Sequence, residues 1–129
     1  MTGRVLYVDG SDVVRKVALR ILQSEGFSVD GARDGYEALG RCATEMPDLI
    51  VVDGTLSDML APELIRHIRA MPNGTHPRIM VSMVELDVGA VMRAKRAGAQ
   101  GYMLKPFDRL MLMKRIGALM HSAASRAAA

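Results

Sequence analysis

The sequence predicts an α/β domain in which five parallel strands alternate with five helices, in a doubly wound sheet of order 2-1-3-4-5. Short apolar runs alternate with amphipathic segments five times along the 129 residues, a pattern typical of a parallel sheet with helices on both faces. The apolar run 49–52 has no polar alternation, as expected of a central strand buried on both faces. Right-handed crossovers leave few topologies for five such units, and the order 2-1-3-4-5 is a common one.

Residues that cap or break helices mark the expected boundaries. Ser11 is expected to cap the first helix and Gly26 to end it. Asp34, followed three residues later by Glu37, is typical of a capping box that opens the second helix. The expected strands are 5–8, 27–32, 49–52, 78–83 and 101–104, and the other helices begin near Pro62, Asp87 and Asp108. We expect one domain over residues 1–121, with 122–129 as a frayed tail.

Composition excludes several classes of protein. The single cysteine, Cys42, cannot form an internal disulfide and is expected to be a buried, reduced thiol. The apolar runs are far shorter than the roughly 20 residues of a membrane-spanning helix, and the first residues contain no secretion signal. A net charge of +3 is too small and dispersed to indicate a nucleic-acid binder. These features predict a cytoplasmic protein that neither inserts into a membrane nor binds DNA.

Charged side chains follow three of the expected strands. In doubly wound sheets, ligands and chemistry gather at the carboxyl ends of the strands, which brings Asp9, Asp53 and Lys105 to one edge. Two adjacent carboxylates favour a divalent cation such as Mg²⁺. With the ammonium of Lys105, the set suits phosphoryl transfer to a carboxylate. A structural ion pair between Lys105 and one of the acids is the alternative interpretation.

Four segments resemble the receiver domain of bacterial response regulators, and together they extend over most of the chain. The segments are Leu6–Asp9, Asp48–Asp53, Arg96–Ala99 and Tyr102–Phe107. The separations of 44 residues from Asp9 to Asp53 and of 52 from Asp53 to Lys105 are also similar to those of the family. The chain looks most like the stand-alone, CheY-like receivers of chemotaxis. The resemblance implies a flavodoxin-like (βα)5 fold and a role in signal transduction rather than an enzyme.

The resemblance also implies a role for each residue at the strand ends. Asp53 would be the phospho-acceptor, and Lys105 would contact the phosphate. The carboxylates of Asp9 and Asp53 and the carbonyl of Thr55 would bind Mg²⁺. Tyr102 would be the aromatic switch that moves between exposed and buried rotamers. Pro106 would follow a cis peptide, which an X-Pro bond adopts at modest cost.

Two departures from the family pattern predict weak activity. Gly10 stands where the family carries a second acid, so Mg²⁺ should bind weakly. The family's Thr or Ser position, 30 residues after Asp53 and 22 before Lys105, falls on Met83, which cannot donate a hydrogen bond. Ser82 precedes it, and its hydroxyl should face the opposite side of the strand unless a bulge rotates it. Met83 would also fill the space that the aromatic switch needs, so we expect impaired phosphorylation of Asp53.

Three functions remain open. The first is a single-domain signalling module that meets a histidine kinase or phosphotransfer protein and contacts a target, such as a flagellar motor component, through its fourth helix, fifth strand and fifth helix. The second is a working Mg²⁺-dependent phospho-receiver. The third is an effector of cyclic di-GMP, because certain CheY-like proteins bind cyclic dinucleotides through arginine-rich segments, and Arg93, Lys95 and Arg96 form a basic cluster. A solvated helix face is the plainer interpretation of that cluster.

Overall fold

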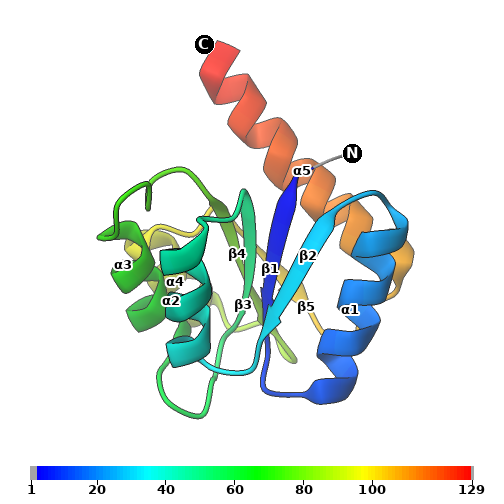
Figure 1. Cartoon of the computed structure of the whole chain (residues 1–129), viewed down its shortest axis with the longest axis horizontal. Helices are drawn as coiled ribbons and strands as arrows, with labels where there is room; N and C mark the ends of the chain where they lie inside the picture. The colour runs from blue at the N-terminus through cyan, green and yellow to red at the C-terminus, as the bar shows by residue number, and fades with distance from the viewer. Residues whose placement is uncertain (1–2, 129) are drawn as a thin grey trace.

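In the computed structural model, five parallel strands and five helices alternate along the chain (Figure 1). The structure describes residues 3–128, with side chains for 3–121. The strands are β1 (Arg4–Val8), β2 (Ser28–Ala32), β3 (Leu49–Asp53), β4 (Arg78–Met83) and β5 (Gly101–Leu104). The helices are α1 (Asp12–Ser24), α2 (Gly35–Thr44), α3 (Ala61–Arg69), α4 (Val88–Ala97) and α5 (Arg109–Ala128). The sheet order β2-β1-β3-β4-β5 confirms the predicted fold class.

The sheet separates two apolar cores, because successive side chains of a strand point to opposite faces. Figure 1 shows α2, α3 and α4 on one face and α1 and α5 on the other. The first core takes Leu6 and Val8 from β1, with Ile50 and Val52 from β3. The second core takes the intervening residues, including Tyr7 and Val51. The central strand β3 is therefore buried on both sides, as its unbroken apolar run predicts.

Four helices begin at the side-chain caps that the sequence predicts. The carboxylate or hydroxyl oxygen of each cap accepts a hydrogen bond from a backbone N–H in the first helical turn. The pairs are Ser11 with Val14 at 3.2 Å, Asp34 with Glu37 at 2.8 Å, Asp87 with Ala90 at 3.0 Å, and Asp108 with Met111 at 2.8 Å. Helix α3 has no side-chain cap and instead carries Pro62 in its first turn. These caps fix the residue at which each helix begins.

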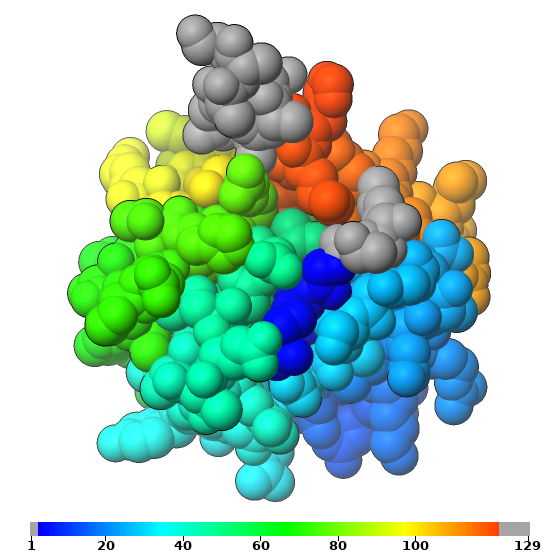
Figure 2. All heavy atoms as spheres, turned by 45° about the horizontal axis from the view of Figure 1, so that its top comes forward, coloured from blue at the N-terminus to red at the C-terminus, as the bar shows by residue number. Residues whose placement is uncertain are grey.

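The edge where the strands begin is held by ion pairs. Figure 2 faces this edge, and the start of β1 (dark blue) reaches the surface between the light blue and green segments. Arg4 pairs with Asp30 at 3.3 Å and with Glu45 at 3.1 Å, and its backbone N–H donates to Asp48 Oδ2 at 2.8 Å. His76 Nε2 lies 2.7 Å from Asp48 Oδ1. These contacts join the start of β1 to β2, to the end of α2, and to the residues that precede β3 and β4.

Two further expectations concern Cys42 and the end of the chain. Cys42 is buried in the first core, and burial raises the pKa of its thiol to about 11, which confirms the predicted buried thiol.

The predicted frayed tail comprises residues 122–129. The backbone of residues 122–128 continues helix α5, but the side chains of these residues and the whole of residue 129 lie outside the described part of the structure. The domain boundary at residue 121 therefore stays a prediction. Across the described residues, none of the helices has the length and apolar character required to span a membrane.

Candidate functional site

Asp9, Asp53 and Lys105 meet at the carboxyl ends of β1, β3 and β5, as the sequence predicts. Lys105 Nζ lies 2.8 Å from Asp9 Oδ2 and 3.4 Å from Asp53 Oδ2. The Asp9 side chain is 1% exposed, whereas those of Lys105 and Asp53 are 13% and 17% exposed. Of the two acids, Asp53 is therefore the one that a reactant can reach.

At this edge of the sheet, the two carboxylates of Asp9 and Asp53 share the single ammonium of Lys105. Burial and the nearby charge of Asp9 raise the pKa of Asp53, and the ammonium of Lys105 offsets only part of this effect. Desolvation alone would lower the pKa of Lys105, but the hydrogen bond with Asp9 and the charge of Asp53 outweigh it, and the pKa is raised. The folded protein thus holds an ionised Lys105 between two acids, and Asp53 gains a proton more easily than an ordinary aspartate.

Both carboxylate oxygens of Asp9 already have partners. Oδ1 accepts the backbone N–H of Ser11 at 2.9 Å, and Oδ2 accepts Lys105 at 2.8 Å. The carbonyl of Asp9 accepts a hydrogen bond from Arg15 Nη1 at 2.7 Å, and the other terminal nitrogen of Arg15 binds Asp12. Asp12 is consequently engaged in the first turn of α1 and does not substitute for the acid missing at Gly10.

The residues present are oxygen donors of the kind that Mg²⁺ takes. The expected ligands are the carboxylates of Asp9 and Asp53 with the carbonyl of Thr55, and Mg²⁺ commonly keeps several waters in such sites. Thr55 lies in the loop after β3, and its N–H donates to Asp53 Oδ1 at 3.4 Å. Among the described residues, no three His, Cys, Asp or Glu side chains group around a possible metal position. When bound, the ion would neutralise charge on the phosphoryl oxygens.

Ser82 and Met83 face opposite sides of β4. Pairing of β4 continues without a gap to Ser82 along β3 and to Met83 along β5, so no bulge rotates Ser82 toward the face of Met83. Met83 belongs to the core under α2, α3 and α4, against which Tyr102 also packs. The hydroxyl of Ser82 is fully buried and has no hydrogen-bond partner among the described residues. Ser82 pairs in register with Asp53 and therefore lies on the same face of the sheet as the acceptor, whereas Met83 packs with Val52 on the opposite face.

A second buried hydroxyl belongs to Tyr7 of β1. Its oxygen likewise has no hydrogen-bond partner in the described part of the chain. Burial raises the pKa of Tyr7 strongly, with smaller contributions from the charges of Asp9 and Asp53. The phenol therefore stays protonated beside the acids. The sequence interpretation treats Tyr7 as a strand residue and does not anticipate this environment.

Tyr102 and Pro106 lie at the end of β5, beside the site. The guanidinium carbon of Arg115 lies 4.8 Å from the centroid of the Tyr102 ring, within the range of a cation–π contact. Tyr102 is half-buried in this arrangement. The Lys105–Pro106 peptide is cis, as the family resemblance implies.

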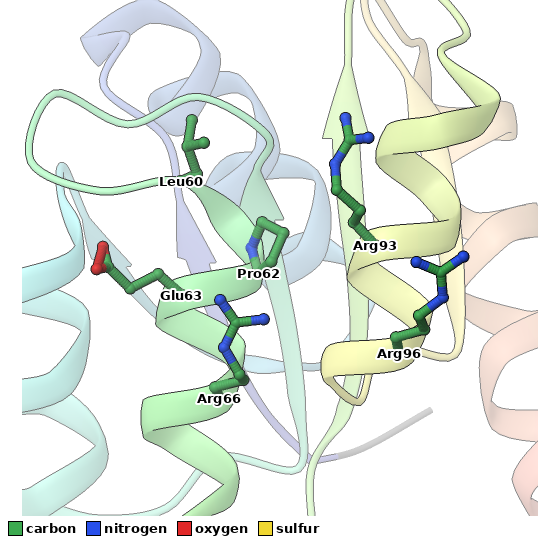
Figure 3. A pocket seen from close by; sticks show the side chains of 6 residues that line it. All are labelled: Leu60, Pro62, Glu63, Arg66, Arg93 and Arg96. Atoms are coloured by element: carbon green, nitrogen blue, oxygen red, sulfur yellow. The ribbon is translucent and has the colours of Figure 1, made fainter.

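The expected basic cluster of α4 is divided between two surfaces. Arg93 and Arg96 line a hollow between α3 and α4, together with Arg66 of α3 (Figure 3). Lys95 instead lines a separate hollow with Tyr102 and Arg115. The expectation of one patch formed by Arg93, Lys95 and Arg96 is therefore not met, since residues on a helix diverge according to their position around its axis.

Asp58 is a site residue that the sequence interpretation does not identify. Its two carboxylate oxygens accept the backbone N–H groups of Gly35 and Tyr36, each at 2.9 Å. Desolvation opposes ionisation of Asp58, but these hydrogen bonds prevail and lower its pKa. The loop that follows Asp53 is thereby attached to the start of α2. An isolated acid in a loop gives no sequence signal for a partner 23 residues earlier.

Comparisons with known proteins agree with this geometry. A family model described as response regulator receiver domain matches residues 5–117. The chain is 34% identical over 116 residues to the transcriptional regulatory protein CseB of Streptomyces coelicolor, covering 90% of this chain and 48% of CseB. It is 34% identical over 120 residues to the response regulator MprA of Mycobacterium tuberculosis, covering 93% of this chain and 51% of MprA. The chain thus spans about half the length of these curated relatives.

Solved structures show the same likeness over a whole chain. The chemotaxis response regulator CheY4 of Vibrio cholerae superposes with a TM-score of 0.87 at 28% identity, covering 92% of this chain and 99% of CheY4. Since CseB is named a transcriptional regulatory protein, the expectation that the present protein binds no DNA receives no support. The matched residues include both strand-end acids and Lys105. The chain belongs to the response regulator receiver domain family.

Proposed function

We propose that this receiver signals through protein contacts and that phosphorylation of Asp53 is slow and weakly coupled to its output face. The observation that supports this most directly is Gly10, which lies exposed in the loop after β1 where the family resemblance implies a second acid for Mg²⁺. Met83 bears on the coupling instead, because its side chain is 9% exposed and packed in the core under α2, α3 and α4. The hydroxyl next to the acceptor is that of Ser82, which pairs in register with Asp53.

The acceptor itself retains much of its chemistry. Asp53 is accessible, and Lys105 lies within 3.4 Å to balance charge on a transferred phosphoryl group. The two carboxylates, with no acid at Gly10, should bind Mg²⁺ weakly. This change predicts an acceptor that works below the rate of a receiver with the full set of acids.

Coupling between Asp53 and Tyr102 should be weak as well. In the family's switch, the hydroxyl residue moves toward the phosphoryl group and vacates space for the aromatic ring. Met83 fills this space from the same face of the sheet, and Arg115 holds the ring of Tyr102 from outside. We therefore expect the ring of Tyr102 to keep its rotamer when Asp53 is phosphorylated.

Intact-mass measurement tests the proposal. The protein is incubated with acetyl phosphate and Mg²⁺, and an Asp53→Asn variant serves as the control that cannot form the acyl phosphate. The expected result is a slow, substoichiometric gain of one phosphoryl group by the wild type and none by the variant. Rapid, stoichiometric modification that Asp53→Asn abolishes would overturn the proposal and support a working Mg²⁺-dependent receiver.

The convergence of Asp9, Asp53 and Lys105 favours that working receiver as the second candidate. The binding of Mg²⁺ separates the two proposals. Amide shifts that saturate at low millimolar Mg²⁺ are expected for the working receiver, whereas the impaired receiver should show weak, unsaturated shifts. The third alternative, an effector of cyclic di-GMP, stays a prediction that isothermal titration tests. Its proposed cluster does not form a single surface.

Partner contacts are proposed for the face formed by α4, β5 and α5. Met92 of α4 is 48% exposed and Met111 of α5 is 39% exposed, and flexible thioether side chains suit adaptable interfaces. Met103 of β5 is fully buried and belongs to the core instead. A histidine kinase or phosphotransfer protein as input, a flagellar motor component as target, and a cytoplasmic location stay predictions.

A further inference from the structure

A hollow of about 390 Å³ lies between α3 and α4, away from the acceptor site. Its walls are Leu60, Pro62, Glu63 and Arg66 on the side of α3, and Arg93 and Arg96 on α4. Figure 3 shows the Arg66 and Arg93 side chains extending toward the space between the two helices, while the carboxylate of Glu63 points away from them. Three arginines thus line one concave surface, and the side chains of Arg66 and Arg93 extend into it.

These three arginines have no acidic partner within 4.0 Å among the described residues, unlike Arg4, Arg15, Arg33, Arg41 and Arg109. Like charges that converge without a counter-charge are unfavourable by Coulomb's law. The surface around the hollow is therefore one that an anion should stabilise.

Arg69, one turn further along α3, shows the contrast. Its guanidinium donates to the carbonyls of Gly98, Gly74 and Pro77 at 2.7–3.2 Å. This residue fixes the end of α3 against the end of α4, and α3 and α4 pack directly on each other. The walls of the hollow are consequently held in place by a structural arginine, and the free arginines lie on preformed walls.

The remaining lining indicates what kind of anion fits. Leu60 is 59% exposed, and with Pro62 it supplies an apolar ledge beside the guanidinium groups. Guanidinium forks match phosphate oxygens and also stack on flat rings. A volume of about 390 Å³ lies near the lower end of the range for small-molecule pockets, roughly 300–1,000 Å³. Phosphate, a flat ring and this size are the properties of a mononucleotide.

We propose that the hollow between α3 and α4 binds a nucleoside monophosphate, with Arg66 and Arg93 on the phosphate and Leu60 and Pro62 against the base or sugar. This site is independent of the phosphorylation of Asp53. Leu60 also forms a β-bridge with Thr55 in the loop that follows Asp53, so an occupied hollow would contact the segment that borders the acceptor.

Titration of the ¹⁵N-labelled protein with AMP, GMP and pyrophosphate tests the proposal. At low salt, the nucleotides should shift the amides of α3 and α4 and saturate in the millimolar range or below. Arg66→Ala and Arg93→Ala should each weaken binding at least tenfold. Leu60→Ala, at a largely exposed position, should weaken binding of the nucleotides but not of pyrophosphate.

Two variants serve as matched controls. Lys95→Ala removes a cation from the same helix but outside the hollow, and Asp53→Asn removes the acceptor; both should bind the nucleotides as the wild type does. Absence of saturable shifts with either nucleotide would overturn the proposal. Equal affinity for pyrophosphate and the nucleotides would also overturn the proposal, as would a loss of affinity in Lys95→Ala equal to that in Arg66→Ala or Arg93→Ala. Each of these outcomes would mean that binding depends only on diffuse positive charge.

Discussion

Replacement of Met83 by threonine tests which face of β4 serves the acceptor site, because it adds a hydroxyl next to Ser82 and removes a thioether from the core. Met83 lies opposite Leu104 on β5 and is 9% exposed. Truncation of a buried methionine to alanine typically costs 2–5 kcal/mol. Threonine keeps part of the volume, so we expect a loss of about 2–3 kcal/mol in the free energy of unfolding. Urea denaturation measures this loss directly.

The same substitution should leave the rate of phosphorylation of Asp53 nearly unchanged. Met83 packs on the face of the sheet opposite to Asp53, so a hydroxyl added there does not reach the phosphoryl oxygens. Met83→Leu is the matched control, because it nearly conserves volume, should cost less than about 1.5 kcal/mol, and adds no donor. Acetyl phosphate with Mg²⁺ and intact-mass analysis compares the three proteins. If the threonine variant is modified much faster than the leucine variant, position 83 faces the acceptor site and this reasoning is wrong.

Three further predictions concern charge and packing. Asp53→Asn should raise the melting temperature at neutral pH, because the pKa of Asp53 is raised on folding and its ionised form therefore destabilises the fold. Thermal melts should show this gain shrink as the pH falls through the raised pKa, and it should be lost below the ordinary aspartate pKa of about 3.9, where the acid is protonated in both states. Arg69→Ala should lower the free energy of unfolding by about 3 kcal/mol in urea, since it leaves buried carbonyls such as that of Gly98 unpaired, and Arg69→Lys should recover only part of this. Gly10→Asp should strengthen Mg²⁺ binding, measured as a larger rise in melting temperature when the ion is added. A Cβ at this position meets only the carbonyl of Arg33, at 3.7 Å, so the fold accommodates the larger residue. A failure to gain affinity would mean that the missing acid is not the cause of weak binding.

The sequence predicts the fold well because each local signal agrees with the others. The cap residues Ser11, Asp34, Asp87 and Asp108 all begin helices as expected. The apolar runs become strands, and right-handed crossovers then leave few sheet orders. Convergence of the strand-end charges follows from this topology, since the carboxyl ends of parallel strands share one edge.

Side-chain partners outside the regular elements are much harder to predict. Asp58 binds the start of α2 from a loop, and the three-dimensional course of a loop depends on contacts that periodicity does not encode. Lys95 and Arg93 are two residues apart yet line different hollows. The contribution of Arg66 could not be foreseen either, because it depends on how closely α3 approaches α4.

The two departures from the family pattern differ in how firmly the fold holds them. Gly10 is exposed in the loop after β1, and neither its backbone nor its neighbours prevent a larger residue. Met83 lies in a strand whose register is fixed on both sides, by β3 and by β5. A shift of one residue would turn Met83 toward the opposite face of the sheet. It would also move every other side chain of β4 to the wrong face. The missing acid can therefore be restored by one loop substitution, whereas Met83 and Ser82 cannot exchange faces without rebuilding β4.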